Sequence, residues 1–125
     1  MILSPTSLKR LVGVHPDLVK VVKRAAEITD TPFIVTEGLR TLARQRQLVA
    51  SGASKTMNSR HLNGHAVDLA CIVDGKLSWA WPLYHRLAKI VKQAAAEVNV
   101  PVEWGGDWPR FRDGPHWQLP WKKYP

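Results

Sequence analysis

The sequence predicts a small α+β domain in which an antiparallel sheet is flanked by helices. Segments with apolar residues at helical spacing alternate along the chain with short β-branched runs. An Asp-Gly pair at residues 74–75 separates two such runs, which is typical of a hairpin and therefore of antiparallel pairing. The length of 125 residues suits a single domain, residues 1–125, and leaves no room for a second of similar size.

The first half of the chain is expected to contain two helices and one strand. Apolar residues recur at helical spacing over 16–27, and the proline that opens this stretch is tolerated in a first helical turn. Thr31-Pro32 ends the pattern, and the short β-branched run 33–36 predicts a strand. A second helix is expected over 41–50, with its threonine as the N-cap and Gly52 at its end.

The second half of the chain is expected to supply most of the sheet. Residues 66–73 form an apolar run typical of a buried strand, and residues 76–79 can pair back across the Asp-Gly turn. The strongest helical pattern begins at Pro82 and continues to Val98, with its apolar residues on one face. The remaining segments are an irregular stretch at 53–65, a strand at 102–104, a loop at 105–114 and a last strand at 116–119.

The composition is that of a globular protein with a basic surface. Hydrophobic residues make up 45% of the chain and charged residues 22%, which excludes a disordered or fibrous class. Eighteen Lys and Arg against ten Asp and Glu give a net charge of +8, which favours anionic partners such as nucleic acid, lipid or bacterial envelope polymers. No apolar run approaches the ~20 residues that span a bilayer, so no transmembrane segment is expected.

The N-terminus and the cysteine content indicate where the chain is made. The first residues lack a basic region followed by an apolar core, so no secretory signal is expected. Cys71 is the only cysteine, which favours synthesis in a reducing cytosol. Its place in an apolar strand favours packing over a role as a nucleophile.

The densest polar cluster lies where the irregular stretch meets the long expected strand. It contains two imidazoles, of His61 and His65, and the carboxylate of Asp68. Because side chains alternate along a strand, Asp68 shares a face with two small residues, Ala66 and Ala70. An acid on a short apolar strand is normally paired or binds a metal, so Asp68 is a candidate ligand.

A second polar cluster, Asp113 to Trp117, follows much later in the chain. A catalytic zinc needs three imidazole or carboxylate ligands and one open position. If the two strands are neighbours, His61, Asp68 and His116 can supply those ligands. Asp113 would then lie near the open position, where a carboxylate can take a proton from a metal-activated water.

The two clusters together resemble the signature of a family of zinc peptidases. The matching pattern is Ser-x-His-x-x-Gly-x-Ala-x-Asp, followed by Asp-x-x-His-Trp. This family, the LAS metallopeptidases, cuts bacterial cell-wall peptides and includes VanY-like D-alanyl-D-alanine carboxypeptidases, dipeptidases and the L-alanyl-D-glutamate endolysins of phages. The resemblance extends to the segments 37–41 and 103–108 and to Gln45, in the family's order. It departs at Leu39, where the family has an aromatic residue.

The resemblance implies a fold, a cofactor and a catalytic centre. The fold would be Hedgehog/DD-peptidase-like, with one Zn²⁺ held by His61, Asp68 and His116. Asp113 matches the family's general base, which is Glu in many relatives and Asp in the phage enzymes.

The resemblance also implies groups that contact the substrate. Arg40 matches an arginine that faces the cleft, where its donors could polarise the scissile carbonyl or hold a substrate carboxylate. The alternative for Arg40 is a buried ion pair with Glu37 or Asp107. Ser59 would donate a hydrogen bond to the bound peptide or, alternatively, close a turn. Three tryptophans would line a groove or belong to the core: Trp104, Trp108 and Trp117.

The function that follows is a zinc endopeptidase, a phage endolysin that hydrolyses peptidoglycan stem peptides at the L-alanyl-D-glutamate bond. Such a monomeric lysin would be made in the host cytoplasm and reach the wall after the membrane is permeabilised. The alternatives are a D-alanyl-D-alanine carboxypeptidase and a non-catalytic zinc- or polyanion-binding domain, as in Hedgehog signalling domains. No specific nucleic-acid binding is expected, because the basic residues are scattered and form no recognised motif.

Overall fold

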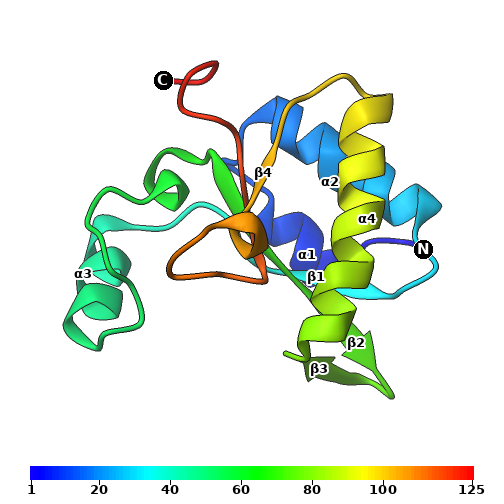
Figure 1. Ribbon diagram of the computed structural model, residues 1–125, viewed down its shortest axis with the longest axis horizontal. Helices are drawn as coiled ribbons and strands as arrows, with labels where there is room; N and C mark the ends of the chain where they lie inside the picture. Colours follow the sequence, from blue (N-terminus) through cyan, green and yellow to red (C-terminus); the bar gives the residue numbers. More distant parts are fainter.

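A five-stranded antiparallel sheet lies at the centre of the computed structural model, which describes residues 1–125 (Figure 1). The long strand β2 pairs with β1 along one edge and with both β5 and β3 along the other, and β4 extends the sheet beyond β5. The strands are β1 (Phe33–Glu37), β2 (Ala66–Val73), β3 (Lys76–Ser78), β4 (Glu103–Trp104) and β5 (His116–Gln118). The α+β class and the antiparallel sheet predicted from the sequence are therefore confirmed.

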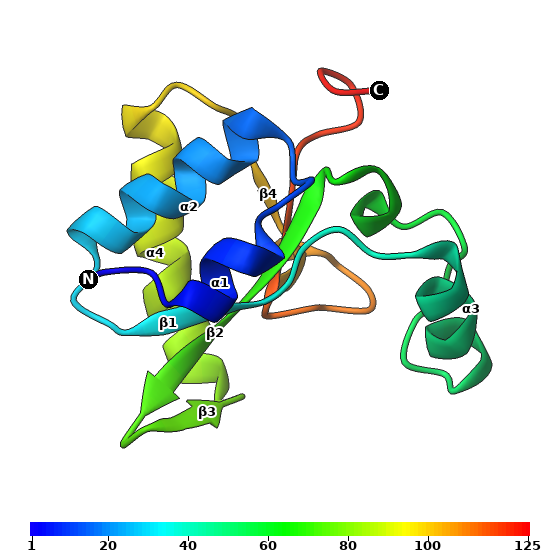
Figure 2. The same ribbon diagram turned by 180° about the vertical axis from the view of Figure 1, so that it is seen from behind.

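Four α-helices and two short 3-10 helices surround this sheet. They are α1 (Pro5–Arg10), α2 (Pro16–Ile28), α3 (Leu42–Ala50), α4 (Trp81–Glu97), η1 (Arg60–Asn63) and η2 (Gly105–Asp107). Helices α2 and α4 pack against each other, whereas α3 stands apart from them, as Figures 1 and 2 show from opposite sides. None of the helices is both long and apolar enough to cross a membrane.

The predicted helices and strands lie within a few residues of their expected positions, and α1 is the α-helix that the sequence analysis missed. The 3-10 helices η1 and η2 lie in segments that were expected to be irregular. The six residues of α1 are too few to show a helical period, although Ser4 caps it and Pro5 occupies its first turn. The Ser7 hydroxyl at its centre accepts a hydrogen bond from the Val35 main chain at 3.0 Å, so α1 is attached to the edge strand β1.

The core contains 23 buried residues from the sheet and the helices. Val67, Leu69 and Cys71 belong to it, as their alternation along β2 predicts. Trp104 and Trp117 are cross-strand partners whose rings stack at 5.9 Å between centroids, and both are buried. These two tryptophans therefore belong to the core rather than to a groove, and the core fixes β5 between β2 and β4.

Candidate metal centre

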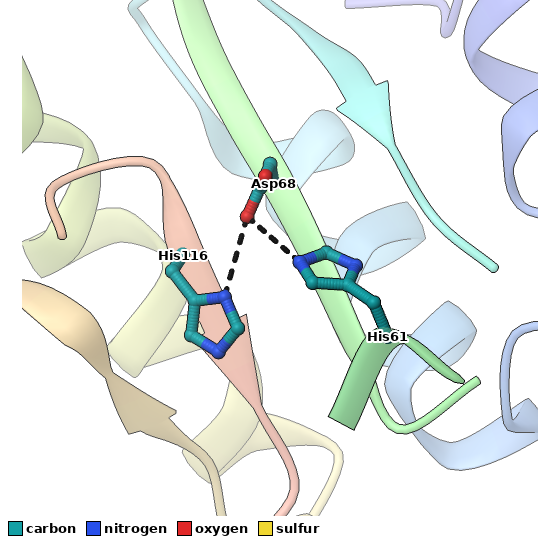
Figure 3. Close-up of side chains that lie close together, drawn as sticks. All are labelled: His61, Asp68 and His116. Carbon is teal, nitrogen blue, oxygen red and sulfur yellow. Dashed lines mark hydrogen bonds and ion pairs between the residues drawn. The ribbon is translucent and has the colours of Figure 1, made fainter. Parts of the chain in front are cut away.

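Three side chains from two strands and a 3-10 helix converge on one point (Figure 3). Asp68 on β2 and His116 on β5 are directly paired across the sheet, and η1 places His61 beside them. Asp68 Oδ1 lies 3.1 Å from His61 Nε2 and 3.4 Å from His116 Nδ1. The three donor atoms lie within 4.8 Å of one another, so a single cation could contact all of them. The structure thus brings together the three residues that the sequence analysis named as ligands.

The protonation state of Asp68 suits metal binding. Burial raises the pKa of this carboxyl group, but hydrogen bonds from His116 and His61 and the charges of both rings lower it by more. The net result is a pKa well below the usual range, so the carboxylate is ionised. At His116 burial lowers the pKa, and the hydrogen bond and charge of Asp68 raise it overall.

The orientation of His61 is set by the main chain. Its Nδ1 lies 2.8 Å from the carbonyl oxygen of Gly38, which can only accept, so Nδ1 carries the hydrogen. When a metal takes the place of the hydrogen that His61 shares with Asp68, the lone pair of the neutral ring is on Nε2, which faces Asp68. Two imidazole nitrogens and one carboxylate oxygen form a donor set that zinc accepts, and the residues present therefore fit such an ion.

Arg40 lies beside the centre and is held by its neighbours. Its guanidinium donates to both carboxylate oxygens of Glu37, at 2.6 and 2.9 Å, and to Gln45 Oε1 at 2.7 Å. Its Nη2 is 4.0 Å from Asp68 Oδ2. The predicted ion pair with Glu37 is therefore present, whereas the one with Asp107 is wrong, because Asp107 pairs with Lys92 on α4 at 2.7 Å.

Gln45 connects Arg40 to the segment after α3, a role that the sequence analysis did not assign. It is the only buried residue of α3. Its amide nitrogen donates to Ser54 Oγ at 2.9 Å and to the carbonyl oxygen of Thr56 at 2.5 Å. The sequence indicated Gln45 only as part of the family resemblance, because its partners depend on how the chain folds back.

Asp113 lines the same groove as the three converging residues. Burial and the negative charge of Asp68 raise the pKa of its carboxyl, and the charges of His116, His61 and Arg40 offset only part of this. Its main-chain nitrogen donates to the Gly105 carbonyl at 3.0 Å. A side chain at residue 105 would clash with the main-chain oxygen of Asp113, so Gly105 permits this close approach.

Ser59 and Trp108, both named from the sequence, also line the groove. The Ser59 hydroxyl accepts a hydrogen bond from the His61 main chain at 3.2 Å and so caps η1, which is the turn-closing role. The half-buried Trp108 ring lies 5.1 Å from the His116 ring between centroids. Of the three tryptophans considered, Trp108 is therefore the one at the candidate site.

The groove has a volume of about 930 Å³ and a mixed charge. Its wall is formed by the segment after α3, the loop before β5 and the ends of β4 and β5. Its charged lining residues are Glu37, Arg40, Lys55, Arg60, Asp68, Glu103, Arg110, Arg112 and Asp113. A space of this size can take a short peptide segment across the converging residues.

A His-Asp-His cluster in an open groove, with a further carboxylate nearby, could hold one metal ion of the kind that hydrolytic enzymes use. The family model described as phage L-alanyl-D-glutamate peptidase matches residues 1–118. The chain belongs to this family and is therefore a peptidase. The family, fold class and enzyme class predicted from the sequence are confirmed.

Individual relatives agree with this assignment. The chain is 34% identical over 106 residues to the L-alanyl-D-glutamate peptidase of Escherichia phage T5, across 82% of this chain and 77% of that protein. It is 38% identical over 99 residues to the L-alanyl-D-glutamate peptidase of Listeria phage A118, across 79% of this chain and 34% of that protein.

A solved structure has nearly the same fold. The crystal structure of the Serratia marcescens L-Ala D-Glu endopeptidase ChiX matches with a TM-score of 0.92 and 48% identity, covering 98% of this chain and 92% of that chain. The vancomycin resistance D,D-dipeptidase VanXYg matches with a TM-score of 0.60 and 14% identity, covering 85% of this chain and 50% of that one. The second likeness concerns the fold alone.

Proposed function

We propose that this peptidase uses one zinc ion, held by His61, Asp68 and His116, to hydrolyse the L-alanyl-D-glutamate bond of peptidoglycan stem peptides. The observation that carries the proposal is the convergence of these three donor atoms within 4.8 Å in a groove that Asp113 also lines. The similarity to relatives named as L-alanyl-D-glutamate peptidases supports the choice of bond.

Asp113 is the proposed general base. A zinc ion, when bound, supplies Lewis acidity to the scissile carbonyl and to a water molecule. Asp113 accepts a proton from the attacking water and later returns it to the leaving amine. The raised pKa of this carboxyl supports the assignment, because a general base is more effective when its pKa lies nearer the working pH.

Arg40 is proposed to contact the substrate with the donors that its neighbours leave free. A guanidinium has five N–H groups, and Glu37 and Gln45 take three of them. The remaining two, one on each terminal nitrogen, can polarise the scissile carbonyl or bind a substrate carboxylate. Ser59 is proposed to donate its hydroxyl hydrogen to the bound peptide, and Trp108 to pack against it.

The partner and setting are part of the same proposal. The net charge of +8 would hold the protein near an anionic cell wall. We propose that a monomer made in the host cytoplasm reaches peptidoglycan after the membrane is permeabilised, as an endolysin does. Cells producing the protein should then lyse only after a membrane-permeabilising agent is added. Lysis without the agent would contradict this order of events.

The test of the activity is digestion of purified peptidoglycan, followed by mass spectrometry of the fragments. Cleavage at the proposed bond leaves new amino termini on D-glutamate, and a chelator should abolish their formation. Release of free D-alanine without those termini would overturn the proposal in favour of a D-alanyl-D-alanine carboxypeptidase. If neither product forms with the zinc-loaded protein, the proposed bond specificity is contradicted.

A further inference from the structure

The second nitrogen of His116 is held by a side chain that the proposed reaction does not use. His116 Nε2 lies 2.8 Å from Gln118 Oε1, and both residues are buried. They are two positions apart on β5, so their side chains are on the same face of the sheet. An amide oxygen can only accept, so the hydrogen of the neutral His116 ring is on Nε2.

The orientation of the Gln118 amide is fixed in turn by Glu103. Gln118 Nε2 donates to Glu103 Oε2 at 3.3 Å. The two residues are directly paired between β4 and β5, so the register of the sheet brings them together. A carboxylate can only accept, and the amide nitrogen must therefore face Glu103 while the amide oxygen faces His116.

This arrangement determines which His116 nitrogen can bind a metal. With the hydrogen on Nε2, the lone pair of the neutral ring is on Nδ1. Nδ1 is the atom that lies 3.4 Å from Asp68 Oδ1 and belongs to the converging donor set. The opposite tautomer would place a hydrogen toward the cation and leave the Gln118 oxygen without a donor.

We propose that Gln118, held by Glu103, is a positioning residue that fixes the ring and the tautomer of His116 for metal binding. The proposal rests on the proposed function only in sharing its metal centre. The two histidines differ in the group that orients each ring. His61 takes its orientation from the main-chain oxygen of Gly38, whereas His116 depends on a side chain that can be replaced.

A neutral amide is suited to this position. It accepts the Nε2 hydrogen without adding a negative charge next to the ligand, and the charge of Glu103 lies one hydrogen bond further away. Partners of this kind orient metal-bound histidines, and their loss typically weakens metal affinity about 10- to 100-fold. The exposed carboxylate of Glu103 also polarises the amide in the direction that strengthens the His116 hydrogen bond.

The test is a zinc titration of the metal-free protein in competition with a chromogenic chelator. Gln118→Met keeps the size of the side chain but removes the acceptor, and we expect zinc affinity to fall by about 10- to 100-fold. The double variant Gln118→Glu with Glu103→Gln exchanges the two side chains. Its carboxylate at position 118 can accept from His116, its amide at position 103 can donate across the strands to that carboxylate, and the net charge is unchanged. We expect this exchanged pair to regain most of the affinity.

A matched control separates positioning from stability. Val91→Ala removes buried volume from α4, away from the site, and should lower the melting temperature without changing zinc affinity. Unchanged zinc affinity in folded Gln118→Met, or an equal loss in Val91→Ala, would overturn the proposal. Failure of the exchanged pair to bind zinc better than Gln118→Met would overturn it too.

A spectroscopic measurement examines the tautomer directly. Nitrogen-15 shifts of the zinc-loaded protein should show the His116 hydrogen on Nε2 and the metal on Nδ1, and metal on Nε2 would overturn the proposal. None of these measurements uses hydrolysis. A protein whose zinc affinity depends on Gln118 but which leaves peptidoglycan intact would therefore support this inference and contradict the proposed function.

Discussion

The two sides of the groove are built in different ways. On one side, Asp68 and His116 belong to strands whose neighbouring residues are in the core, so the sheet fixes their separation. On the other side, α3 stands apart from the body of the molecule and contributes one buried residue, Gln45. That side is connected to the centre by polar contacts from Gln45 to Arg40 and to the segment at 54–56.

This difference separates two requirements of a peptidase. Donor atoms for a metal need a fixed geometry, which apolar packing and strand pairing provide. A wall that receives a substrate has fewer buried contacts, and regions of this kind open at lower free energy than the core. Changes on the sheet side should therefore abolish metal binding or hydrolysis, whereas changes on the α3 side should alter local stability and substrate affinity.

The largest effect is expected from Asp68→Ala on the sheet side. Removing the carboxylate leaves two imidazoles, too few for a stable mononuclear zinc site. We expect zinc binding to be lost and peptidoglycan hydrolysis to fall to the level of the chelator-treated protein, as measured by metal analysis and fragment mass spectrometry. Retention of one bound zinc ion per chain would contradict the assignment of Asp68.

Asp113→Ala should keep the metal and lose the reaction. Without a group to accept the proton, the hydrolysis rate should fall about 10²- to 10⁴-fold while zinc content stays at one ion per chain. Asp107→Ala is the matched control, since Asp107 is exposed, precedes the same loop and pairs only with Lys92. Normal wall hydrolysis by Asp113→Ala would remove this residue from the mechanism.

Gln45→Leu should loosen the α3 side alone. The change leaves polar partners of Gln45 unsatisfied, at a cost of about 1–3 kcal/mol. Hydrogen exchange should speed up in α3 and in residues 53–59, while β2 stays protected. Gln47→Leu, on the exposed face of the same helix, serves as the control. Equal loss of hydrogen-exchange protection in β2 would show that the two sides of the groove do not unfold independently.

The smallest effect is expected from Trp108→Ala, which removes an aromatic face beside His116. We expect KM for peptidoglycan fragments to rise about two- to tenfold, with kcat nearly unchanged, because packing of this kind contributes about 0.5–1.5 kcal/mol. Trp79→Ala removes an exposed tryptophan that does not line the groove and should leave KM unchanged. A large fall in kcat in Trp108→Ala would place this ring in the chemistry rather than in binding.

Features that depend on local sequence were predictable. The apolar run of β2 and the Asp-Gly turn after it indicate a strand and a hairpin without knowledge of the rest of the chain. His61, Asp68 and His116 were selected together through the resemblance to a known family, since their spacing alone left open whether their strands are neighbours. Helix α1 was missed because a six-residue helix shows no clear period.

Features that depend on tertiary pairing were not predictable. The link from His116 through Gln118 to Glu103 requires the pairing of β5 with β4, which nothing in either segment reveals alone. The ion pair with Asp107, one of the two alternatives considered for Arg40, is wrong for a similar reason. Asp107 is captured by Lys92 on α4, a helix that reaches it only in the folded molecule.

The direct pairing of Asp68 with His116 makes activity a stringent report on correct folding. Sliding the last strand by one residue along its neighbour would turn the imidazole to the opposite face and put Trp117 in its place. Such a misfolded chain would keep every donor residue and could still look well ordered by circular dichroism, yet it would take up no cation. Counting metal-competent molecules therefore measures how many chains in a preparation have found the native alignment.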